Sequence, residues 1–429
     1  MAVYLICYLA SYILARFDHY LVSGVLLLAS AIWLYMEDYR KYKNLIHLRG
    51  LFSLFWVGGE GLACLKLSNL QTDWSGMTWF CLFLAYIGFW LVFEALVRAY
   101  GSGYDGYGRW RSFSGDPRPV FTMICALTAV SLACFITESV VLGYVPLLLR
   151  GVPHAYSEFH LTGIHYFTVS CVLVPSLTVL YIHMRNGRGS EKLLIAALVM
   201  TGISLLIPIL CVSRFQLVFA VLLAAFTYIS LQKLFHPGWL IGLFVVLLPF
   251  YLILTVARSH NIEYLNGIFE MKRASMPIFI SQPYIYIANN YDNFNCMVEA
   301  LPGHSFGLKG LFPLWALSGL KFFFPQLINF PIYVDKTELT TLTLFYDSYY
   351  DFGWIGVLLF SCILGAVAYI LVVKLREMRN PLGYLLYAQF AAYLMLSFFT
   401  TWFSNTTTWF YLILTGIMAL FYHLRASRW

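Results

Sequence analysis

Long apolar runs, separated by short polar connections, occupy most of the chain. A helix that crosses a bilayer needs about 20 mostly apolar residues, and the runs are of this length. Read in order, they give about twelve expected spans, at residues 2–17, 20–36, 51–67, 77–97, 120–142, 163–182, 193–211, 215–232, 238–257, 353–373, 382–400 and 406–424. The pattern therefore predicts an all-α, polytopic integral membrane protein.

The composition agrees with a lipid environment. Hydrophobic residues make up 61% and charged residues 11% of the 429 positions, whereas a soluble domain carries about 25% charged residues. The formal net charge of +7 comes from basic residues clustered between the apolar runs. Such clusters are typical of topology signals, so the charge does not indicate a nucleic-acid partner.

Lys and Arg are distributed unevenly between alternate connections, and this distribution predicts the orientation of the chain. One set of connections contains Arg40, Lys41, Lys43, Arg49, Arg98, Arg109, Arg111, Arg118, Arg185, Arg188, Lys192, Lys233, Lys374, Arg376, Arg379, Arg425 and Arg428. The opposite short connections contain Arg16, Lys66, Arg150 and Arg214. The richer set is expected to be cytoplasmic, together with both termini.

This orientation places one long polar stretch, residues 258–350, outside the membrane. We expect a membrane domain over 1–257, then this extracytoplasmic loop, then three C-terminal helices over 351–429, all within one integral domain. Short helices around 310–330 are expected to re-enter the membrane or to lie on it. Loops of this length in a compact protein are usually functional, so we expect the candidate chemistry in this loop.

Several cofactor signatures are missing from the sequence. It contains no GxxxxGK[ST] phosphate-binding loop, no HExxH, and no paired-aspartate DxD in the expected cytoplasmic connections. His154, His160 and His165 follow one another at spacings of six and five, which do not stack metal ligands on one helix face. We therefore expect no metal, no cofactor and no reaction that consumes a cytoplasmic nucleotide.

Basic residues on the expected outer side are candidates for binding an anion. Arg214 lies between two spans in VSRFQ, and Arg258 follows the next outward-going span in ARSH. A guanidinium group presents a rigid fork that matches phosphate oxygens. Arg273 could extend such a patch, and Lys309 follows in the same loop. An anchor at the end of a span, or a solvated loop face, explains each of them equally well.

A turn in the loop contains the candidate base. Pro302 and Gly303 precede His304 in PGHSFG, which favours a turn over a helix. Histidine is the usual proton acceptor near neutral pH. Asp347 and Asp351, four residues apart, share one face if the following helix begins early. Asp351 equally suits the start of a helix, where the dipole favours a carboxylate.

Together these features resemble the oligosaccharide repeat-unit polymerases, the Wzy-type family of O-antigen, capsule and exopolysaccharide synthesis. The resemblance is carried by the Ser213-Arg214 junction, the turn Pro302–Gly307, the aromatic region Leu311–Pro331 and the stretch Thr340–Gly365, which reads TTLTLFYDSYYDFGWIGVLLFSCILG. It covers most of the chain from about residue 190 onward. It implies a multi-span, GT-C-like glycosyltransferase fold.

The resemblance also implies a function, namely metal-independent, inverting glycosyl transfer. Such an enzyme would join repeat units carried on undecaprenyl pyrophosphate at the outer face of a bacterial cytoplasmic membrane, with a chain-length regulator and a flippase as further partners. Its pyrophosphate-binding residues would be Arg214, Arg258, Arg273 and Lys309. His304 would be the base, with Asp347 as the alternative. The residues that contact sugar would be Tyr291, Tyr346 and Asp351.

Two other functions fit the same pattern. A lipid-linked-sugar ligase, or another external multi-span transferase, would share the site but use a different acceptor. A transporter or lipid-linked oligosaccharide flippase would need polar residues near the middle of the membrane, where this sequence offers Glu60, Glu94 and Glu138. Because polar residues gather in the outer loop instead, we expect polymerisation.

Overall fold

The computed structural model describes residues 1–102, 115–149, 155–187, 190–232, 267–273, 275–375 and 377–426. Within these residues every regular element is a helix, and the only β pairing is an isolated bridge between Ser68 and Met271. The all-α class predicted from the sequence is therefore confirmed. The expected span at 238–257 and the candidate residue Arg258 lie outside the described residues.

Eight described helical segments are long and apolar enough to cross a membrane. They are α2 (Tyr20–Tyr42), α5 (Gly76–Tyr100), α6 (Arg118–Leu142), the run of α8 (Ile164–Val169), η3 (Ser170–Leu173) and α9 (Val174–Arg185), α10 (Glu191–Leu210), α11 (Arg214–Leu231), α17 (Tyr346–Lys374) and α19 (Thr406–Ala426). Two shorter apolar helices, α1 (Ala2–Arg16) and α18 (Leu382–Met395), coincide with two further expected spans. The chain is a polytopic helical protein suited to the bilayer, and the total of twelve spans stays a prediction.

The described helices form two compact units that interleave along the chain. Unit 1 comprises Met1–Tyr107, Asn261–Lys374 and Tyr393–Trp409. Unit 2 comprises Gly108–His260, Leu375–Ala392 and Phe410–Trp429. The three consecutive ranges expected from the sequence stay a prediction.

Unit 1 is built on α1, α2, α5 and α17, together with the expected span at 51–67. That span is a run of α3 (Leu48–Phe52), the π-helical turn η1 (Ser53–Val57) and α4 (Gly58–Cys64). Glycines let its helices approach closely. A Cβ on Gly365 of α17 would overlap the carbonyl of Phe89 in α5, and Gly61 and Gly24 meet in the same way between α4 and α2. Small residues at crossings are typical of helices packed within a membrane.

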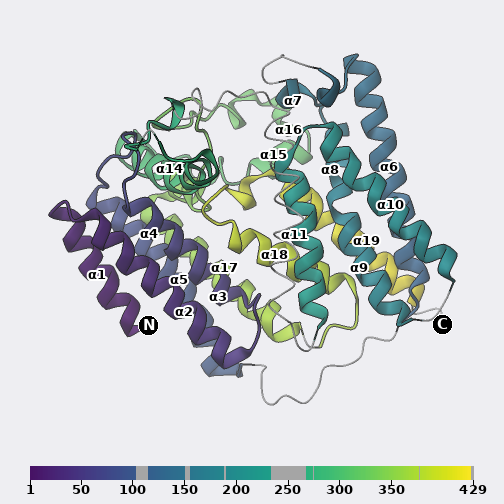
Figure 1. Cartoon of the computed structure of the whole chain (residues 1–429), viewed down its shortest axis with the longest axis horizontal. Coiled ribbons are helices and arrows are strands. Elements are labelled where there is room, and N and C mark those ends of the chain that lie inside the picture. The colour runs from purple at the N-terminus through teal and green to yellow at the C-terminus, as the bar shows by residue number, and fades with distance from the viewer. Residues whose placement is uncertain are drawn as a thin grey trace. The chain divides into compact units, whose positions relative to one another are not determined.

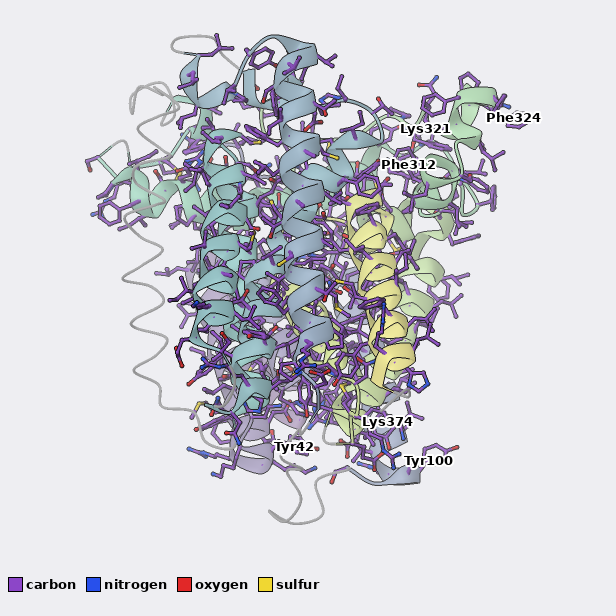
Figure 2. The ribbon with its side chains drawn as sticks, turned by 90° about the vertical axis from the view of Figure 1, so that its right-hand side faces the viewer. Tyr42, Tyr100, Phe312, Lys321, Phe324 and Lys374 are labelled. Carbon is purple, nitrogen blue, oxygen red and sulfur yellow. The ribbon has the colours of Figure 1, made fainter. Side chains whose placement is uncertain are left out.

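The long helices of unit 1 end at one level, and the short helices of the long loop lie at the opposite level. Three C-terminal helix residues lie together at the bottom of Figure 2: Tyr42 of α2, Tyr100 of α5 and Lys374 of α17. Three residues of the long loop lie at the top: Phe312, Lys321 and Phe324. The short helices there are α15 (Phe312–Leu317), α16 (Leu320–Phe323) and the 3-10 turn η4 (Pro325–Leu327), where the sequence predicted short helices.

The long loop also contains a helix that the sequence did not predict, α14 (Ile278–Ala300). It is seen nearly end-on in Figure 1, whereas α1 and α2 of the same unit run across the picture. Its buried polar side chains include Asn289, Asn290, Asp292, Asn293 and Asn295. Asparagine is a poor helix former and Pro283 lies inside the helix. Local propensity therefore gave no helical signal, and tertiary hydrogen bonds supply the missing stability.

Those hydrogen bonds tie α14 to the segments around it. The buried carboxylate of Asp292 accepts from Lys66 Nζ (3.0 Å) and from Trp74 Nε1 (2.7 Å). The side-chain amide of Asn293 donates to the carbonyl oxygens of Leu339 (2.8 Å) and Thr341 (2.9 Å). The partners of Asp292 and of Asn293 all lie far from α14 in sequence. Through the two bonds of Asn293, α14 holds in place the chain that leads into α17.

Unit 2 contains α6, the run α8–η3–α9, α10, α11 and α19, with most of α18; its minor elements are α7 (Ala155–Glu158) and the 3-10 turn η2 (Pro146–Leu148). Glu138, near the end of α6, is fully buried. Its carboxylate accepts from the amide of Leu161 (2.9 Å) and from the hydroxyl of Thr168 (2.7 Å), and lies 3.1 Å from Nδ1 of His165. A buried carboxylate with this many partners joins α6 to the chain around α8.

Candidate functional site

The helix α17 is kinked near its start. Phe352 (φ −140°, ψ 18°) and Gly353 (φ 61°, ψ −148°) leave the helical conformation. A residue with a side chain enters the Gly353 conformation only under strain. In an uninterrupted helix the carbonyls of Tyr350 and Asp351 would accept from amides four residues later. The kink leaves these carbonyls for a different partner.

That partner is the turn Pro302–Gly310 of the long loop, which we call the His304 turn. The amide of Ser305 donates to the carbonyl of Tyr350 (3.2 Å), and the amide of Phe306 donates to the carbonyl of Asp351 (3.1 Å). Phe306 itself has a positive φ of 52°. The contact is therefore made of backbone groups that the kink in α17 and the bend in the turn leave available.

The carboxylate of Asp351 closes the His304 turn. Its Oδ1 accepts from the hydroxyl of Ser305 and from the amide of Lys309 (3.1 Å), and its Oδ2 accepts from the amide of Gly310 (2.8 Å). A Cβ on Gly310 would lie 2.5 Å from that oxygen, so glycine is needed for the approach. Asp351 is buried, and its oxygens face the turn. Asp351 therefore organises the turn, and its predicted contact with sugar stays a prediction.

His304 lies exposed on this turn. Its Nδ1 is 3.3 Å from the carbonyl oxygen of Tyr350. Because a carbonyl can only accept, the hydrogen bond requires the proton on Nδ1, and Nε2 of the neutral ring is then an acceptor. A Cβ on Gly353 would lie 3.1 Å from Nε2. The glycine at the kink therefore also leaves room for the imidazole.

A cation and a second carboxylate lie beside the turn. Lys309 Nζ is 3.8 Å from Asp347 Oδ1 and 4.5 Å from the ring centroid of Tyr350. The side chains of Lys309 and Asp347 are 12% and 8% exposed. Among the described residues this Asp347 oxygen has no hydrogen-bond partner. The two groups thus form a nearly buried ion pair beside the His304 turn.

The two tyrosines predicted to contact sugar are buried in unit 1. The hydroxyl of Tyr291 donates to the carbonyl of Trp56 (2.7 Å), and its ring packs against Trp56 and Trp74. The hydroxyl of Tyr346 accepts from the amide of Tyr333 (2.8 Å) and donates to its carbonyl (3.0 Å). Both residues are 0% exposed, and a contact with sugar at either one stays a prediction.

The predicted cations have different surroundings. Lys309 lies in the cluster that the structure brings together with His304, Asp347 and Asp351. Arg273 is exposed in unit 1, on the segment that pairs with residues 67–69. Arg214 is half-buried at the start of α11 in unit 2.

Some residues that build the cluster carried no predicted role. Ser305 binds the Asp351 carboxylate, Gly310 allows its approach, and Gly353 creates the kink. Gly310 ends the sequence GLKG, and Gly353 follows the aromatic stretch YYDF at the start of an apolar run. A glycine in an otherwise helical pattern, such as Gly353, is a signal for a special backbone conformation. That signal could have located the kink, but not its partner.

No family model matches the chain, and no curated protein or solved structure matches it either. The resemblance to repeat-unit polymerases therefore stays a prediction.

Proposed function

We propose that this protein is a glycosyltransferase that joins oligosaccharide units carried on a lipid pyrophosphate into a polysaccharide. We place the His304 turn at the outer face of a bacterial cytoplasmic membrane, where both the donor and the growing chain are held by the bilayer. A pyrophosphate is a good leaving group, so the reaction needs no nucleotide at the site. It needs a base for the acceptor hydroxyl and positive charge for the departing phosphates.

The observation that supports this proposal is the exposure of His304 together with the hydrogen bond of its ring. Its ring is exposed, its Nδ1 is held by the Tyr350 carbonyl, and its Nε2 is left as an acceptor. Those are the properties of a general base. Asp347, the alternative base, is buried and paired with Lys309. Of the two candidates, His304 is the one that a substrate hydroxyl can reach without opening the fold.

In the proposed step, the acceptor oxygen bonds to the anomeric carbon of the donor from the side opposite the pyrophosphate. Nε2 of His304 takes the hydroxyl proton, and the bond from the anomeric carbon to the phosphate oxygen breaks. The bonding electrons stay on the pyrophosphate, and the anomeric configuration inverts. Lys309, in the same turn as His304, is the candidate cation of this cluster. Phosphate binding by Arg214, Arg258 and Arg273 stays a prediction from the sequence.

The test is an assay with the purified full-length chain in liposomes that contain undecaprenyl-pyrophosphate-linked oligosaccharide. Products are separated on a gel, where polymerisation gives a ladder. General-base catalysis contributes about 10²–10⁴-fold to a rate, so His304→Gln is expected to slow the ladder by at least about 10²-fold. His19→Gln is the matched control, because His19 is also exposed and in unit 1 but outside the cluster.

The same assay separates the competing functions. Transfer of one unit to a different acceptor, without a ladder, supports a ligase. Movement of the lipid-linked oligosaccharide across the membrane, with no covalent change, supports a flippase. An undiminished ladder from His304→Gln refutes the base assignment, and loss in Asp347→Asn alone would then favour Asp347.

A further inference from the structure

The segment Leu311–Ile332, between the His304 turn and α17, exposes large apolar side chains although it lies in the polar loop of the sequence. They are Leu311, Leu314, Leu317, Leu320, Phe322, Phe323, Phe324, Ile328 and Ile332. Phe322 and Phe323 are 66% and 78% exposed. A contiguous apolar surface of this kind marks a protein or membrane contact. We call this segment the apolar hairpin; its short helices α15 and α16 contact each other and are joined at Gly319, which has a positive φ of 77°.

The charge of the hairpin favours lipid over protein as the contact. Between Gly310 and Val334 the sequence has one charged residue, Lys321, and no carboxylate. A protein interface has a polar rim around its apolar centre, and for such a rim this segment supplies only the uncharged, exposed Ser318, Gln326 and Asn329. A single lysine instead suits a membrane interface, because its long side chain reaches the phosphates while its neighbours stay among acyl chains.

Several backbone N–H groups of the hairpin are hydrogen-bonded within the hairpin itself, which favours contact with lipid. The amides of Leu314, Ser318, Phe322, Phe324 and Leu327 all donate to carbonyls within the hairpin, at 2.9–3.1 Å. Its prolines, Pro313, Pro325 and Pro331, have no N–H to satisfy. The indole of Trp315 donates to the carbonyl of Leu308 (3.0 Å). Irregular backbone is tolerated near hydrocarbon where its polar groups are satisfied internally.

The hairpin lies next to an exposed apolar surface at the start of α17. If α17 crosses the membrane, that surface faces lipid. Phe352 and Trp354, at the start of the apolar part of α17, are exposed. The ring of Phe306 lies 6.3 Å from that of Phe352, and Phe306 is exposed as well. The apolar surface therefore runs from α17 through the His304 turn into the hairpin. In Figure 2 the labelled residues Phe312, Lys321 and Phe324 lie at the end of unit 1 opposite the C-termini of α2, α5 and α17.

We propose that the apolar hairpin is embedded in the leaflet next to the start of α17, at the boundary between head groups and acyl chains. Phe322, Phe323 and Phe324 lie among the acyl chains, and Lys321 reaches the phosphates. The His304 turn directly precedes the hairpin, so it lies at the level of the head groups. This inference does not depend on the proposed transferase activity, because it concerns the bilayer itself.

The test uses the full-length chain in nanodiscs, with its native cysteines replaced and one cysteine introduced by Phe323→Cys for a bimane label. Lipids brominated on their acyl chains quench fluorophores among the chains, and iodide quenches those in water. We expect the label at position 323 to lose most of its emission with brominated lipid and to be protected from iodide. Glu338→Cys is the control, because Glu338 is exposed on the polar part of the same loop; the opposite pattern is expected there.

Two results would overturn the proposal. Quenching of the label at position 323 by iodide, to the extent seen at position 338, would place the hairpin in water. Protection from both quenchers, together with a protein of twice the monomer mass in the nanodisc, would mean that a second copy of the chain covers it. Neither measurement requires substrate, so a failed polymerisation assay would leave the result unaffected.

Discussion

At the scale of single residues, Gly353 determines whether the His304 turn can form. It has φ 61° and ψ −148°, and a Cβ there would lie 3.1 Å from Nε2 of His304. We expect Gly353→Ala to cost about 1–3 kcal/mol of stability from backbone strain and to abolish activity by displacing the imidazole. Thermal unfolding in detergent and the polymerisation assay measure the two effects. Gly202→Ala, at an open position within α10, should be neutral or slightly stabilising.

Asp335, in the chain between η4 and α17, should make stability depend on pH. Burial, together with the nearby Asp292 carboxylate, raises the pKa of Asp335 to about 6. The folded protein therefore binds a proton that the unfolded chain, with a pKa of about 3.9, has already lost. This contribution to stability is complete below about pH 4 and is lost as the pH rises through about 6.

We therefore expect Asp335→Asn to be as stable as the wild type near pH 4 and more stable above about pH 6. Because the carboxyl is partly exposed, the gain should be on the order of 1 kcal/mol rather than the full value of the shift. Melting temperatures between pH 4 and 8 test this. Glu338→Gln removes the same charge at an exposed site of the same loop, and its melting curve should stay parallel to that of the wild type. A parallel curve for Asp335→Asn would contradict the prediction.

At the scale of elements, the helix α14 should depend on its buried ion pair. Lys66 and Asp292 have side chains 5% and 0% exposed. Removal of one partner leaves a buried charge, so Lys66→Met should destabilise the protein by about 3–5 kcal/mol. The double variant Lys66→Met/Asp292→Asn should recover part of this loss. The more exposed pair Lys336–Glu270, with side chains 23% and 44% exposed, is the control, because Lys336→Met should cost less than about 1 kcal/mol. Equal losses for the two lysines would refute the assignment.

The elements differ in how well the sequence predicted them. Apolar helices such as α5 and α10 follow from hydropathy alone, because each has a run long enough to cross the bilayer. The helix α14 did not follow, since its asparagines are paired with residues far away in sequence, such as Leu339. The His304 turn was predicted from Pro302 and Gly303, but its contact with the kink in α17 was not. Local signals locate a bend, whereas only tertiary structure shows what the freed carbonyls bind.

The sequence also predicted some residues of the candidate site better than others. His304 and Lys309 were selected by type and by position in the loop, and both lie in the cluster. Tyr291 and Tyr346 were selected by type as well, yet they are buried, because an aromatic residue suits a membrane-protein core as well as a sugar-binding surface. Composition does not separate these two uses. Burial does, and it depends on the packing of α14 and α17.

At the scale of the whole molecule, the orientation in the membrane decides which solution the His304 turn meets. The basic connections predict that Lys43, at the end of α2, is cytoplasmic and that the long loop is outside. Tyr42, the neighbour of Lys43, and Lys321 of the long loop lie at opposite ends of unit 1 in Figure 2. In a background without native cysteines, Glu338→Cys should therefore react with a membrane-impermeant maleimide in intact spheroplasts.

Lys43→Cys should react with the same maleimide only after the spheroplasts are permeabilised. Both positions are exposed in unit 1, so a difference in labelling reports the side of the membrane rather than burial. The reversed pattern would place His304 and Lys309 in the cytoplasm. The proposed transfer between lipid-linked oligosaccharides at the outer face would then be impossible, whatever the geometry of the base. A molecule inserted in the opposite orientation would keep every intramolecular contact described for the cluster. The labelling therefore tests the orientation in the membrane, on which the proposed function depends and which these contacts do not determine.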